Sequence, residues 1–490
     1  QSLGKTLLRI LPFRHRNKIY ENHRINYHYN LEDYLIAIPI GTASALRKLL
    51  DCVASLWNAH PQIHRLIVGY SGGMDSHVLL HLLAMQRELE PERTLEAVYV
   101  DHGLHAASVA WGEHCARVCQ DLNVPFRVLR VNAHPAPGES PEAAARQARY
   151  AALAAELEPD AALLTAHRRD DQAETLLLQL LRGAGPHVLA AMPEAAHLGQ
   201  GRLLRPLLNV DRAELLAYAR AQQLQWIEDA SNTDTGFDRN YLRHHILPLL
   251  QKRWPAANRV LARSARLCAE TAGWLDAEAD ADLAHIVTVR PDGLSIPALR
   301  ELSELRQRNL LRRWLRKLGL PIPDTRQLQH ILHDTLTAAC DRQPCIHWSG
   351  GEVRRYRDRL YVMPPLAPHD AQQTFLWQPD AAAYPPLELP GLGILRLQKT
   401  VGAGLRSELL DGATLTIRFR QGGERFQPVG RLHRQELKKL LQEAGIPPWR
   451  RERLPLLYWE DALLAVVGLG IAADYAAGPG EAGWQPALTR

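Results

Sequence analysis

One stretch of the chain, LIVGYSGGMDSHVLLHLL at residues 66–83, constrains its fold more than any other. An apolar segment runs into a Gly-rich turn and then into a helical segment, which is typical of phosphate-binding α/β domains. Gly72 and Gly73 permit backbone conformations in which successive N–H groups face an anion. The following helix directs its positive dipole end to the same place. The sequence therefore predicts an anion site at residues 71–76.

This loop lacks the lysine of the Walker A pattern, G-x-x-x-x-G-K-S/T, and carries Asp75 instead. An aspartate beside phosphates makes physical sense when a Mg²⁺ ion lies between them. The alternative is a tight turn without a ligand, but the flanking strand and helix favour the anion site. We therefore expect ATP, Mg²⁺ and AMP-forming activation, with pyrophosphate as the leaving group. The residues expected at the nucleotide are Ser71, Gly72, Gly73, Met74, Asp75 and Ser76.

Strand and helix signals alternate between residues 66 and 183. Strands are predicted at 66–70, 95–100, 126–131 and 161–165, and helices at 76–86, 108–122, 141–157 and 170–182. This alternation predicts an α/β fold, with a Rossmann-like parallel sheet covered by helices on both faces. Ligands should then bind at the carboxyl ends of the strands.

At 490 residues the chain is too long for a single hydrophobic core. We expect an extension of unknown role at 1–50, a nucleotide-binding catalytic domain at 51–240 and a mainly helical domain at 241–363. A Pro-rich linker at 364–390 and a small basic α/β domain at 391–490 should follow. No apolar stretch is long enough to span a membrane. The six cysteines form no CxxC pair and are expected to be reduced and mostly packed, as in a cytoplasmic protein.

The strand–SGGMDS–helix unit resembles the PP-loop ATP pyrophosphatase superfamily, whose members adenylate a carbonyl oxygen and let a nucleophile displace AMP. Further motifs narrow the resemblance: DDQAETLLLQLLRG at 170–183, EDASNTDTGFDRNYLR at 228–243, GGERFQP at 422–428 and LKKLLQEAGIPPWRRERLPLLY at 437–458. Together they resemble the tRNA(Ile)-lysidine synthetase family, from about residue 66 to the C-terminus.

The resemblance implies an ATP-dependent ligase that couples free L-lysine to C2 of the wobble cytidine of a CAU-anticodon isoleucine tRNA. An adenylated cytidine would be the intermediate, and lysidine, AMP and pyrophosphate the products. A cytoplasmic location and a possible homodimer are also expected. The alternatives are another PP-loop tRNA-modifying enzyme, such as a thiolase, or a non-catalytic tRNA-binding protein. The absence of CxxC disfavours the thiolase, and the intact loop and acidic residues disfavour loss of catalysis.

Asp171 and Glu174 lie three residues apart at the start of a predicted helix, directly after a strand of the same sheet. Two carboxylates on one helix face suit the ammonium group of lysine or a metal ion. The alternative is that they stabilise the helix N-terminus and are otherwise solvated. The residues expected to act in catalysis are Asp75, Arg146, Asp171 and Glu174.

Other charged residues at strand ends or on helices are weaker candidates. His102, expected at the nucleotide, and His167 follow predicted strands, although a lone histidine is often structural. Arg146 and Arg149 share a helix face, where they could neutralise phosphates or form surface salt bridges. Arg168 occupies a position that is often the second histidine of the family pattern A-H-H-x-D-D-Q, so no role is assigned to it.

Two groups of cations are expected to contact tRNA. The expected tRNA-binding residues are Arg239, Arg243, Arg434, Lys438, Lys439 and Arg450. For Arg243, packing against Glu228 and Asp229 is the alternative. For the C-terminal group the alternative is a solvated charged helix, but the adjoining Trp449 favours RNA contact.

Overall fold

The computed structural model describes residues 40–87, 92–103, 107–135, 141–286, 293–338, 342, 344–380 and 384–489. The chain divides into two compact units, Gln1–Asp276 and Ala277–Arg490. Most of the predicted extension at 1–50 lies outside the described residues. Its last part is helical, because α4 (Ile40–Ala59) begins there and buries Leu49 and Leu50 in the core of the first unit. Within the described residues, no helix is long and apolar enough to cross a membrane.

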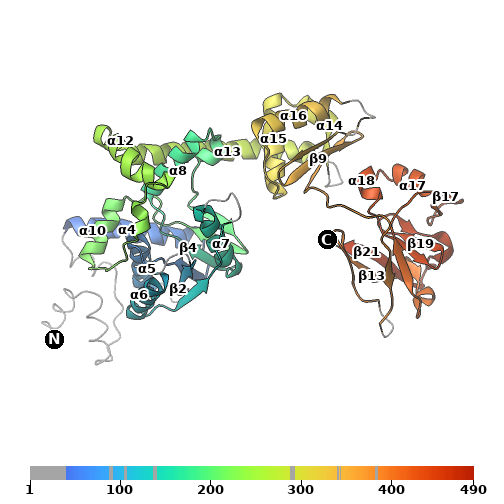
Figure 1. Ribbon diagram of the computed structural model, residues 1–490, viewed down its shortest axis with the longest axis horizontal. Helices are drawn as coiled ribbons and strands as arrows, with labels where there is room; N and C mark the ends of the chain where they lie inside the picture. Colours follow the sequence, from blue (N-terminus) through green and yellow to red (C-terminus); the bar gives the residue numbers. More distant parts are fainter. Residues whose placement is uncertain are drawn as a thin grey trace. The chain divides into compact units, whose positions relative to one another are not determined.

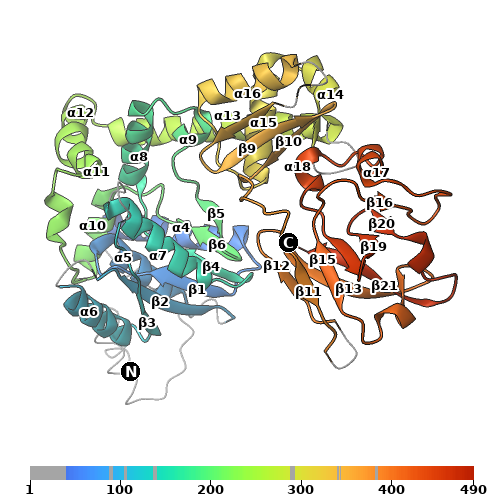
Figure 2. The same ribbon diagram turned by 45° about the vertical axis from the view of Figure 1, so that its right-hand side comes forward.

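In its described part, the first unit is built on a six-stranded sheet with the order β3-β2-β1-β4-β6-β5 (Figures 1 and 2). The strands are β1 (Arg65–Gly69), β2 (Thr94–Asp101), β3 (Phe126–Arg130), β4 (Ala161–Leu164), β5 (Ala195–Leu198) and β6 (Gly201–Leu204). The first four confirm the predicted parallel strands. β6 extends the parallel sheet and β5 pairs antiparallel to it. The β5–β6 hairpin was not predicted, because its strands AAHL and GRLL, unlike AALL of β4, each contain a polar residue that interrupts the apolar run.

Both faces of this sheet are buried, as a parallel sheet requires. Leu66 and Val68 of β1 belong to a core shared with α4, α5, α6 and α10, whereas Ile67 belongs to a second core shared with α7. The covering helices are α5 (Met74–Gln86), α6 (Ser108–Asp121), α7 (Pro141–Ala155) and α10 (Arg212–Ala221). The predicted α/β class is therefore confirmed. The apolar run of β1 is continuous because both of its faces pack against helices.

The strand order places a switch point between β1 and β4. From β1 the chain continues to β2 and β3 on one side, and β4 and β6 follow on the other side of β1. The loops after β1 and β4 therefore leave the sheet in opposite directions and open a crevice between them. The loop after β1 is SGGMDS, and the loop after β4 leads into the acidic start of α8 (Arg169–Leu181).

Of the remaining helical segments of the first unit, α9 (Pro186–Leu189) precedes β5 and the others follow the sheet. The others are η2 (Ala230–Thr233), α11 (Asp238–Tyr241), η3 (Leu242–Ile246), α12 (Leu247–Arg253) and α13 (Ala257–Ile286), which contains the boundary between the two units. The segment η3 is one turn of π-helix between α11 and α12. Such turns occur frequently at functional sites, and this one carries Arg243.

The second unit begins with helices packed on an antiparallel sheet of order β7-β10-β9-β8. Its elements are β7 (Leu294–Ser295), α14 (Ile296–Glu301), α15 (Glu304–Lys317), α16 (Thr325–Thr337), β8 (Cys345–Trp348), β9 (Gly351–Tyr356) and β10 (Arg359–Met363). Leu310, Leu311 and Leu328 on the helices and Val353 and Leu360 on the strands form its core. The predicted helical middle region is thus confirmed, with a small sheet added.

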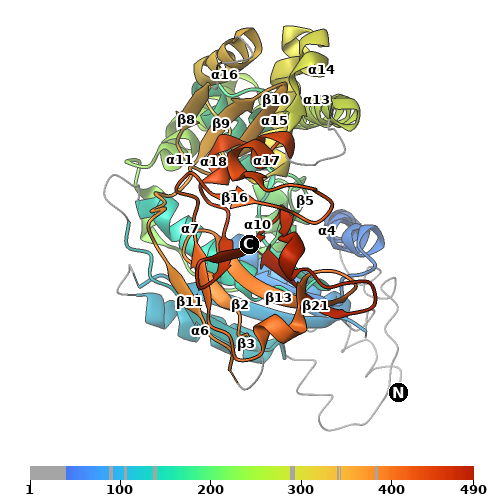
Figure 3. The same cartoon turned by 90° about the vertical axis from the view of Figure 1, so that its right-hand side faces the viewer.

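The C-terminal part of this unit is richer in strands than the predicted α/β domain, with strand orders β11-β15-β18-β19-β20 and β12-β13-β21-β14. Figure 3 shows β11, β13 and β21 of these sheets. The longer elements are β13 (Gly393–Val401), β15 (Leu415–Arg418), β18 (Leu456–Trp459), β19 (Ala462–Val466), β21 (Ala482–Thr489), α17 (Leu437–Glu443) and α18 (Pro448–Arg451). The shorter ones are β14 (Leu405–Arg406), η4 (Ser407–Leu410), β16 (Arg425–Phe426), β17 (Gln435–Glu436), β20 (Gly470–Ile471) and η5 (Ala473–Tyr475).

The segment predicted as a linker at 364–390 contributes to these sheets. β11 (Phe375–Trp377) pairs with β15, and β12 (Leu387–Leu389) pairs with β13. Trp377 is buried in the C-terminal core. The Pro-rich composition hid these strands, because three residues between prolines show no alternation.

Candidate active site

A cavity of about 1030 Å³ opens in the first unit at the switch point of the sheet. It is lined by the loop after β1, the start of α8, the segment around Trp226–Thr233 and the helices that follow. Five of the seven residues predicted at the nucleotide line it, namely Ser71, Gly73, Met74, Asp75 and Ser76. The predicted acidic pair, Asp171 and Glu174, also lines it. The structure therefore brings together the loop and the acidic residues that the sequence singled out.

The SGGMDS loop is held in shape by its own serines. Ser71 N–H donates to Ser76 Oγ at 3.3 Å, and Ser76 Oγ–H donates to the carbonyl oxygen of Gly73 at 3.0 Å. Gly72 has φ +79°, a left-handed conformation that favours glycine. Its carbonyl oxygen accepts from the N–H of Ile227 at 2.9 Å. Gly72 therefore lies behind the loop, where it joins the loop to the cavity wall formed by Ile227.

Arg168 is the buried centre of the acidic side of the cavity. Its side chain is only 5% exposed, and its Nε lies 3.5 Å from Asp75 Oδ2 and 3.4 Å from Asp170 Oδ2. Its Nη1 lies 3.7 Å from Asp171 Oδ2, and its backbone N–H donates to the same oxygen at 2.9 Å. The guanidinium thus neutralises carboxylates from the first turns of two separate helices, α5 and α8. Sequence reasoning missed this role, because nothing in the spacing of the motif shows which way Arg168 points.

A second ion-pair cluster joins α8 to the segment that contains η3. Glu174 is fully buried; it accepts from Arg239 Nε at 2.8 Å and from Arg243 Nε and Nη2 at 2.7 and 2.9 Å. Asp171 Oδ1 lies 3.3 Å from the Nη2 atoms of both arginines. The predicted lysine-binding acids are therefore paired with two of the predicted tRNA-binding cations. The ion pairs of Arg243 run to these acids, in place of the alternative contact with Glu228 and Asp229.

Burial and neighbouring charges shift the pKa values of Asp75, Asp171 and the nearby His167. Burial raises the pKa of Asp75, although the Arg168 guanidinium opposes the change. Burial also disfavours the charged form of Asp171, but Arg168 and Arg239 outweigh it and lower its pKa. Burial lowers the pKa of His167 to about 3, so this imidazole is neutral at neutral pH. Its Nδ1 lies 2.8 Å from Thr165 Oγ1.

The carboxylates of this cavity fit a magnesium ion. Asp75 Oδ1 and Asp170 Oδ2 are buried and have no hydrogen-bond partner among the described residues. Both residues line the cavity. Carboxylate oxygens are the protein ligands that Mg²⁺ prefers, usually together with substrate phosphates. These two oxygens could therefore hold Mg²⁺ beside the SGGMDS loop.

Several predicted residues do not line this cavity. His102 Nε2 accepts from Arg149 Nε at 3.2 Å, beyond the end of β2. The Arg146 guanidinium lies 5.0 Å from the centre of the Tyr150 ring. Neither His102 nor Arg146 is among the lining residues, so the roles expected for them stay predictions.

The sequence analysis also overlooked parts of the cavity wall. The polar or aromatic cavity-lining residues that received no role are Arg168, Asp170, Asp211, Arg212, Trp226, Asn232, Thr233, His244, Gln251, Asn258 and Arg259. Asn232 and Thr233 lie within the EDASNTDTGFDRNYLR motif, which was the available signal for them. Arg168 and Asp170 lie within the AHRRDDQ segment at 166–172, and the remaining residues lie on helices or loops without a recognisable spacing.

The four predicted tRNA-binding residues of the C-terminal region differ in their contacts: the two lysines are exposed, whereas the two arginines contact other side chains. Lys438 and Lys439 are exposed on α17. Arg434 pairs with Asp474 at 3.2 Å, and the Arg450 guanidinium lies 5.9 Å from the centre of the Tyr361 ring. Trp449 is 8% exposed and packs edge-on against Tyr356 and Tyr361. The interpretation of Trp449 as support for RNA contact was therefore wrong, because its ring is buried in a structural cluster.

Comparison with known families places these features in context. Residues 44–250 match a PP-loop domain model, residues 294–361 a TilS substrate binding domain and residues 415–488 a TilS substrate C-terminal domain. The chain also matches a crystal structure of a TilS C-terminal domain, with 22% sequence identity and a TM-score of 0.19. The match covers 23% of this chain and 97% of that domain.

Relatives of known function match most of the chain. The chain is 44% identical over 418 residues to a tRNA(Ile)-lysidine synthase of Coxiella burnetii. The aligned region covers 85% of this chain and 91% of that protein. The chain is also 44% identical over 414 residues to a tRNA(Ile)-lysidine synthase of Methylococcus capsulatus, with 84% and 93% covered. At this identity and coverage, the chain belongs to the tRNA(Ile)-lysidine synthase family.

Proposed function

We propose that this protein catalyses the ATP-dependent conversion of the wobble cytidine of a CAU-anticodon isoleucine tRNA to lysidine. The reaction follows from membership of the tRNA(Ile)-lysidine synthase family. The observation that carries the proposal is the convergence of the SGGMDS loop and the acidic start of α8 on one cavity. An anion-binding loop and a cation-binding carboxylate pair are what ATP and lysine require. The use of ATP agrees with the PP-loop domain at 44–250.

In the first half-reaction, the C2 carbonyl oxygen of cytidine attacks the α-phosphorus of ATP, and pyrophosphate leaves. The N–H groups at the start of α5 and the positive end of its dipole stabilise the negative charge of the leaving group. Asp75 and Asp170 would hold Mg²⁺, which neutralises charge on the phosphates when it is bound. The buried Arg168 holds these carboxylates close to the loop.

In the second half-reaction, the ε-amine of lysine attacks C2 and AMP leaves. Asp171 and Glu174 suit a cationic substrate because both line the cavity as carboxylates, and their present ion pairs with Arg239 and Arg243 compete with lysine for them. Lysine would then bind beside Arg239 and Arg243 or replace one of them. A role for these two arginines at tRNA phosphates requires them to exchange partners. A homodimer and a cytoplasmic location stay predictions.

The direct test is incubation of the full chain with ATP, Mg²⁺, radiolabelled lysine and CAU-anticodon isoleucine tRNA. Label should enter the tRNA only when ATP is present. Omission of lysine should leave tRNA-dependent ATP–pyrophosphate exchange intact, because adenylation comes first. Incorporation of sulfur instead of lysine would favour a thiolase. Absence of exchange with every tRNA would favour a non-catalytic binding protein.

The variant Asp75→Asn should lower ATP–pyrophosphate exchange by about 100-fold or more, because the loop loses its anionic ligand for the metal ion that neutralises the phosphates. Asp160→Asn is the matched control, because this exposed residue directly precedes β4, at the end of the strands away from the SGGMDS loop. The control should exchange at the parental rate. Equal rates in the two variants would show that Asp75 takes no part in adenylation.

The variant Arg168→His should make the stability of the protein depend on magnesium. The substitution leaves the carboxylates of Asp75, Asp170 and Asp171 without their shared buried cation, and loss of one partner of a buried ion pair costs about 3–5 kcal/mol. Millimolar Mg²⁺ should restore part of this loss, because it supplies the missing positive charge. Thermal unfolding with and without Mg²⁺ measures the effect. An identical Mg²⁺ response in the parent and the variant would contradict this role.

Single substitutions Lys438→Ala and Lys439→Ala should each weaken tRNA binding and reduce the slope of log K against log salt by about 0.9. Both side chains are exposed, so the fold should tolerate the change. Deletion of residues 391–490 is a poorer test, because it removes β13 and β15, the partners of β12 and β11. Filter binding over a range of salt concentrations gives the slope. Arg47→Ala, an exposed cation of α4, is the control and should leave the slope unchanged.

A further inference from the structure

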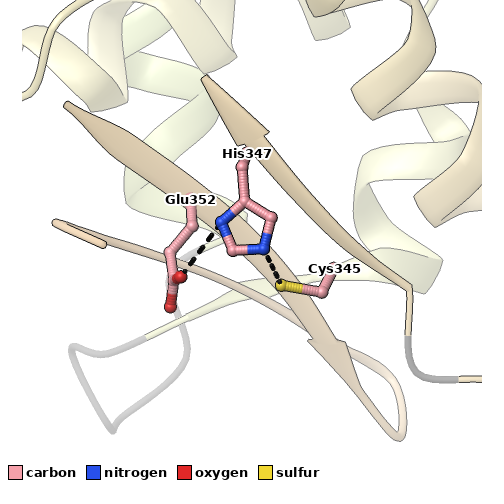
Figure 4. Close-up of side chains that lie close together, drawn as sticks. All are labelled: Cys345, His347 and Glu352. Atoms are coloured by element: carbon pink, nitrogen blue, oxygen red, sulfur yellow. Dashed lines mark hydrogen bonds and ion pairs between the residues drawn. The ribbon is translucent and has the colours of Figure 1, made fainter. Parts of the chain in front are cut away.

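A cluster of metal-ligand side chains lies on the hairpin of β8 and β9, apart from the candidate active site. Cys345 and His347 are two residues apart on β8, so they project from the same face of the sheet. His347 is directly opposite Glu352 of β9 in the antiparallel register. Figure 4 shows the three side chains converging, with the imidazole between the thiol and the carboxylate.

The distances within this cluster approach those of a coordination sphere. Cys345 Sγ lies 3.2 Å from His347 Nε2, and His347 Nδ1 lies 3.3 Å from Glu352 Oε2. One ligand atom from each residue can be chosen such that all three lie within 4.8 Å of one another. Around a tetrahedral Zn²⁺ ion with bonds of about 2.0–2.3 Å, the ligand atoms are roughly 3.5 Å apart. A rotation of the imidazole that turns one nitrogen toward both partners would therefore close the sphere.

One of the three ligands is fixed by its surroundings, and the other two are exposed and can rotate toward a metal ion. Glu352 is 1% exposed, and its carboxylate is held by Arg354, whose Nε and Nη2 donate at 2.8 and 3.3 Å. The side chain of His347 is 60% exposed, and Cys345 is also exposed, so both are free to adjust. A fixed carboxylate oriented by a neighbouring side chain is a common feature of metal sites. The sequence analysis expected most cysteines to be packed, and Cys345 is an exception.

The kinds of ligand atom in this cluster determine which metal ions it can bind. Thiolate, imidazole and carboxylate together suit Zn²⁺ and similar transition metals, whereas Mg²⁺ and Ca²⁺ prefer oxygen ligands alone. In the part of the chain that the structure describes, this is the one group of three His, Cys, Asp or Glu residues with ligand atoms so close together. Arg354 already neutralises Glu352, so charge balance does not explain why Cys345 and His347 gather beside it.

We propose that Cys345, His347 and Glu352 bind a divalent transition metal ion of the Zn²⁺ class. Three protein ligands leave the fourth coordination position for water. Cys345 also lines a cavity of about 450 Å³, together with Arg354, Trp449 and Arg453 of the same unit, so solvent reaches the site. The bound ion would join β8, the edge strand of its sheet, to β9 through side chains as well as backbone.

Cobalt provides the spectroscopic test, because a cysteine thiolate bound to Co²⁺ gives a charge-transfer absorption band. The full-length protein, kept reduced with a phosphine, is titrated with Co²⁺ and then with Zn²⁺. A thiolate band should grow to one equivalent and disappear when Zn²⁺ displaces the cobalt, while millimolar Mg²⁺ should leave it unchanged. Cys345→Ser should abolish the band and His347→Ala should weaken Co²⁺ binding at least about tenfold. Cys268→Ser, a thiol of α13, should retain the band.

Alkylation gives a second readout that does not depend on cobalt. Iodoacetamide should modify Cys345 rapidly in the metal-free protein and at least about tenfold more slowly with Zn²⁺, as measured by mass spectrometry of its peptide. His347→Ala should lose this protection, and its location on an exposed strand face makes the variant safe for folding. The proposal is overturned if the cobalt band survives in Cys345→Ser or if Zn²⁺ leaves the alkylation rate of Cys345 unchanged.

Discussion

Replacement of Glu174 by glutamine is expected to lower the free energy of unfolding by roughly 3–5 kcal/mol. The carboxylate is fully buried and receives hydrogen bonds from both Arg239 and Arg243. A neutral amide leaves these two guanidiniums with only Asp171 as an anionic partner in the cluster. Chemical unfolding followed by circular dichroism measures the loss. The structure thus predicts that a residue assigned to substrate binding also stabilises the fold.

The matched control for this prediction is Glu270→Gln. Glu270 pairs with Arg266 four residues away at 3.5 Å, with both side chains more than half exposed. Surface pairs of this kind contribute at most about 1 kcal/mol. If the two variants unfold at the same denaturant concentration, the cluster on α8 is not a buried ion-pair network in solution.

The same Glu174→Gln variant separates the two half-reactions when it is assayed below its unfolding temperature. Because Glu174 is proposed to bind lysine, the KM for lysine should rise at least about tenfold. The tRNA-dependent ATP–pyrophosphate exchange should change little, because it precedes lysine attack. Asp171→Ala should likewise impair lysine-dependent turnover. A loss of exchange equal to the loss of lysine transfer would assign these acids to adenylation instead.

Replacement of Gly72 by alanine should raise the KM for ATP at least about tenfold and lower ATP–pyrophosphate exchange by about 100-fold. The residue has φ +79°, and an added Cβ would lie 2.6 Å from Ile227 Cδ1 and 3.0 Å from Cys115 Sγ. The side chains of Ile227 and Cys115 would have to shift away from the new methyl group, while the hydrogen bond from the N–H of Ile227 to the carbonyl oxygen of Gly72 holds the loop close to the wall. Initial-rate kinetics with ATP as the varied substrate measure this effect.

Gly183→Ala is the control that isolates backbone strain from the clash. Gly183 has φ +69°, close to that of Gly72, but an added Cβ would meet nothing within 4 Å. It should therefore cost about 1 kcal/mol of stability and leave the affinity for ATP unchanged. If Gly72→Ala behaves like Gly183→Ala, the close packing behind the loop is not needed for nucleotide binding.

The early part of the fold could be predicted because its signals are local. The first four strands lie where the apolar runs predict them, and the SGGMDS loop carries its glycines and serines within six residues. Hydrophobic periodicity and glycine conformation depend on near neighbours in the chain, so they can be read without a structure. The same reasoning missed β5, β6, β11 and β12, which are three or four residues long and lack the continuous four-residue apolar run of β4.

The pairing of charges in the site could not be predicted, because it depends on contacts between distant segments. The hydrogen bonds from Arg239 and Arg243 to Glu174 span 65 and 69 residues. Arg168 meets Asp75 across the switch point between β1 and β4, which exists only after the strands are ordered in the sheet. Motif spacing identified the acidic residues but not the cations that neutralise them.

By itself, the sequence determined the fold class, the anion-binding loop and the family, because each depends on residues within a short segment or on motifs shared with relatives. Only the tertiary structure decided that Arg168 lies among three carboxylates, that Glu174 is buried beneath two arginines and that Trp449 packs inside the second unit. The physical reason is that charge neutralisation and aromatic burial are set by which surfaces meet in space. Sequence spacing does not specify those meetings when tens of residues separate the partners.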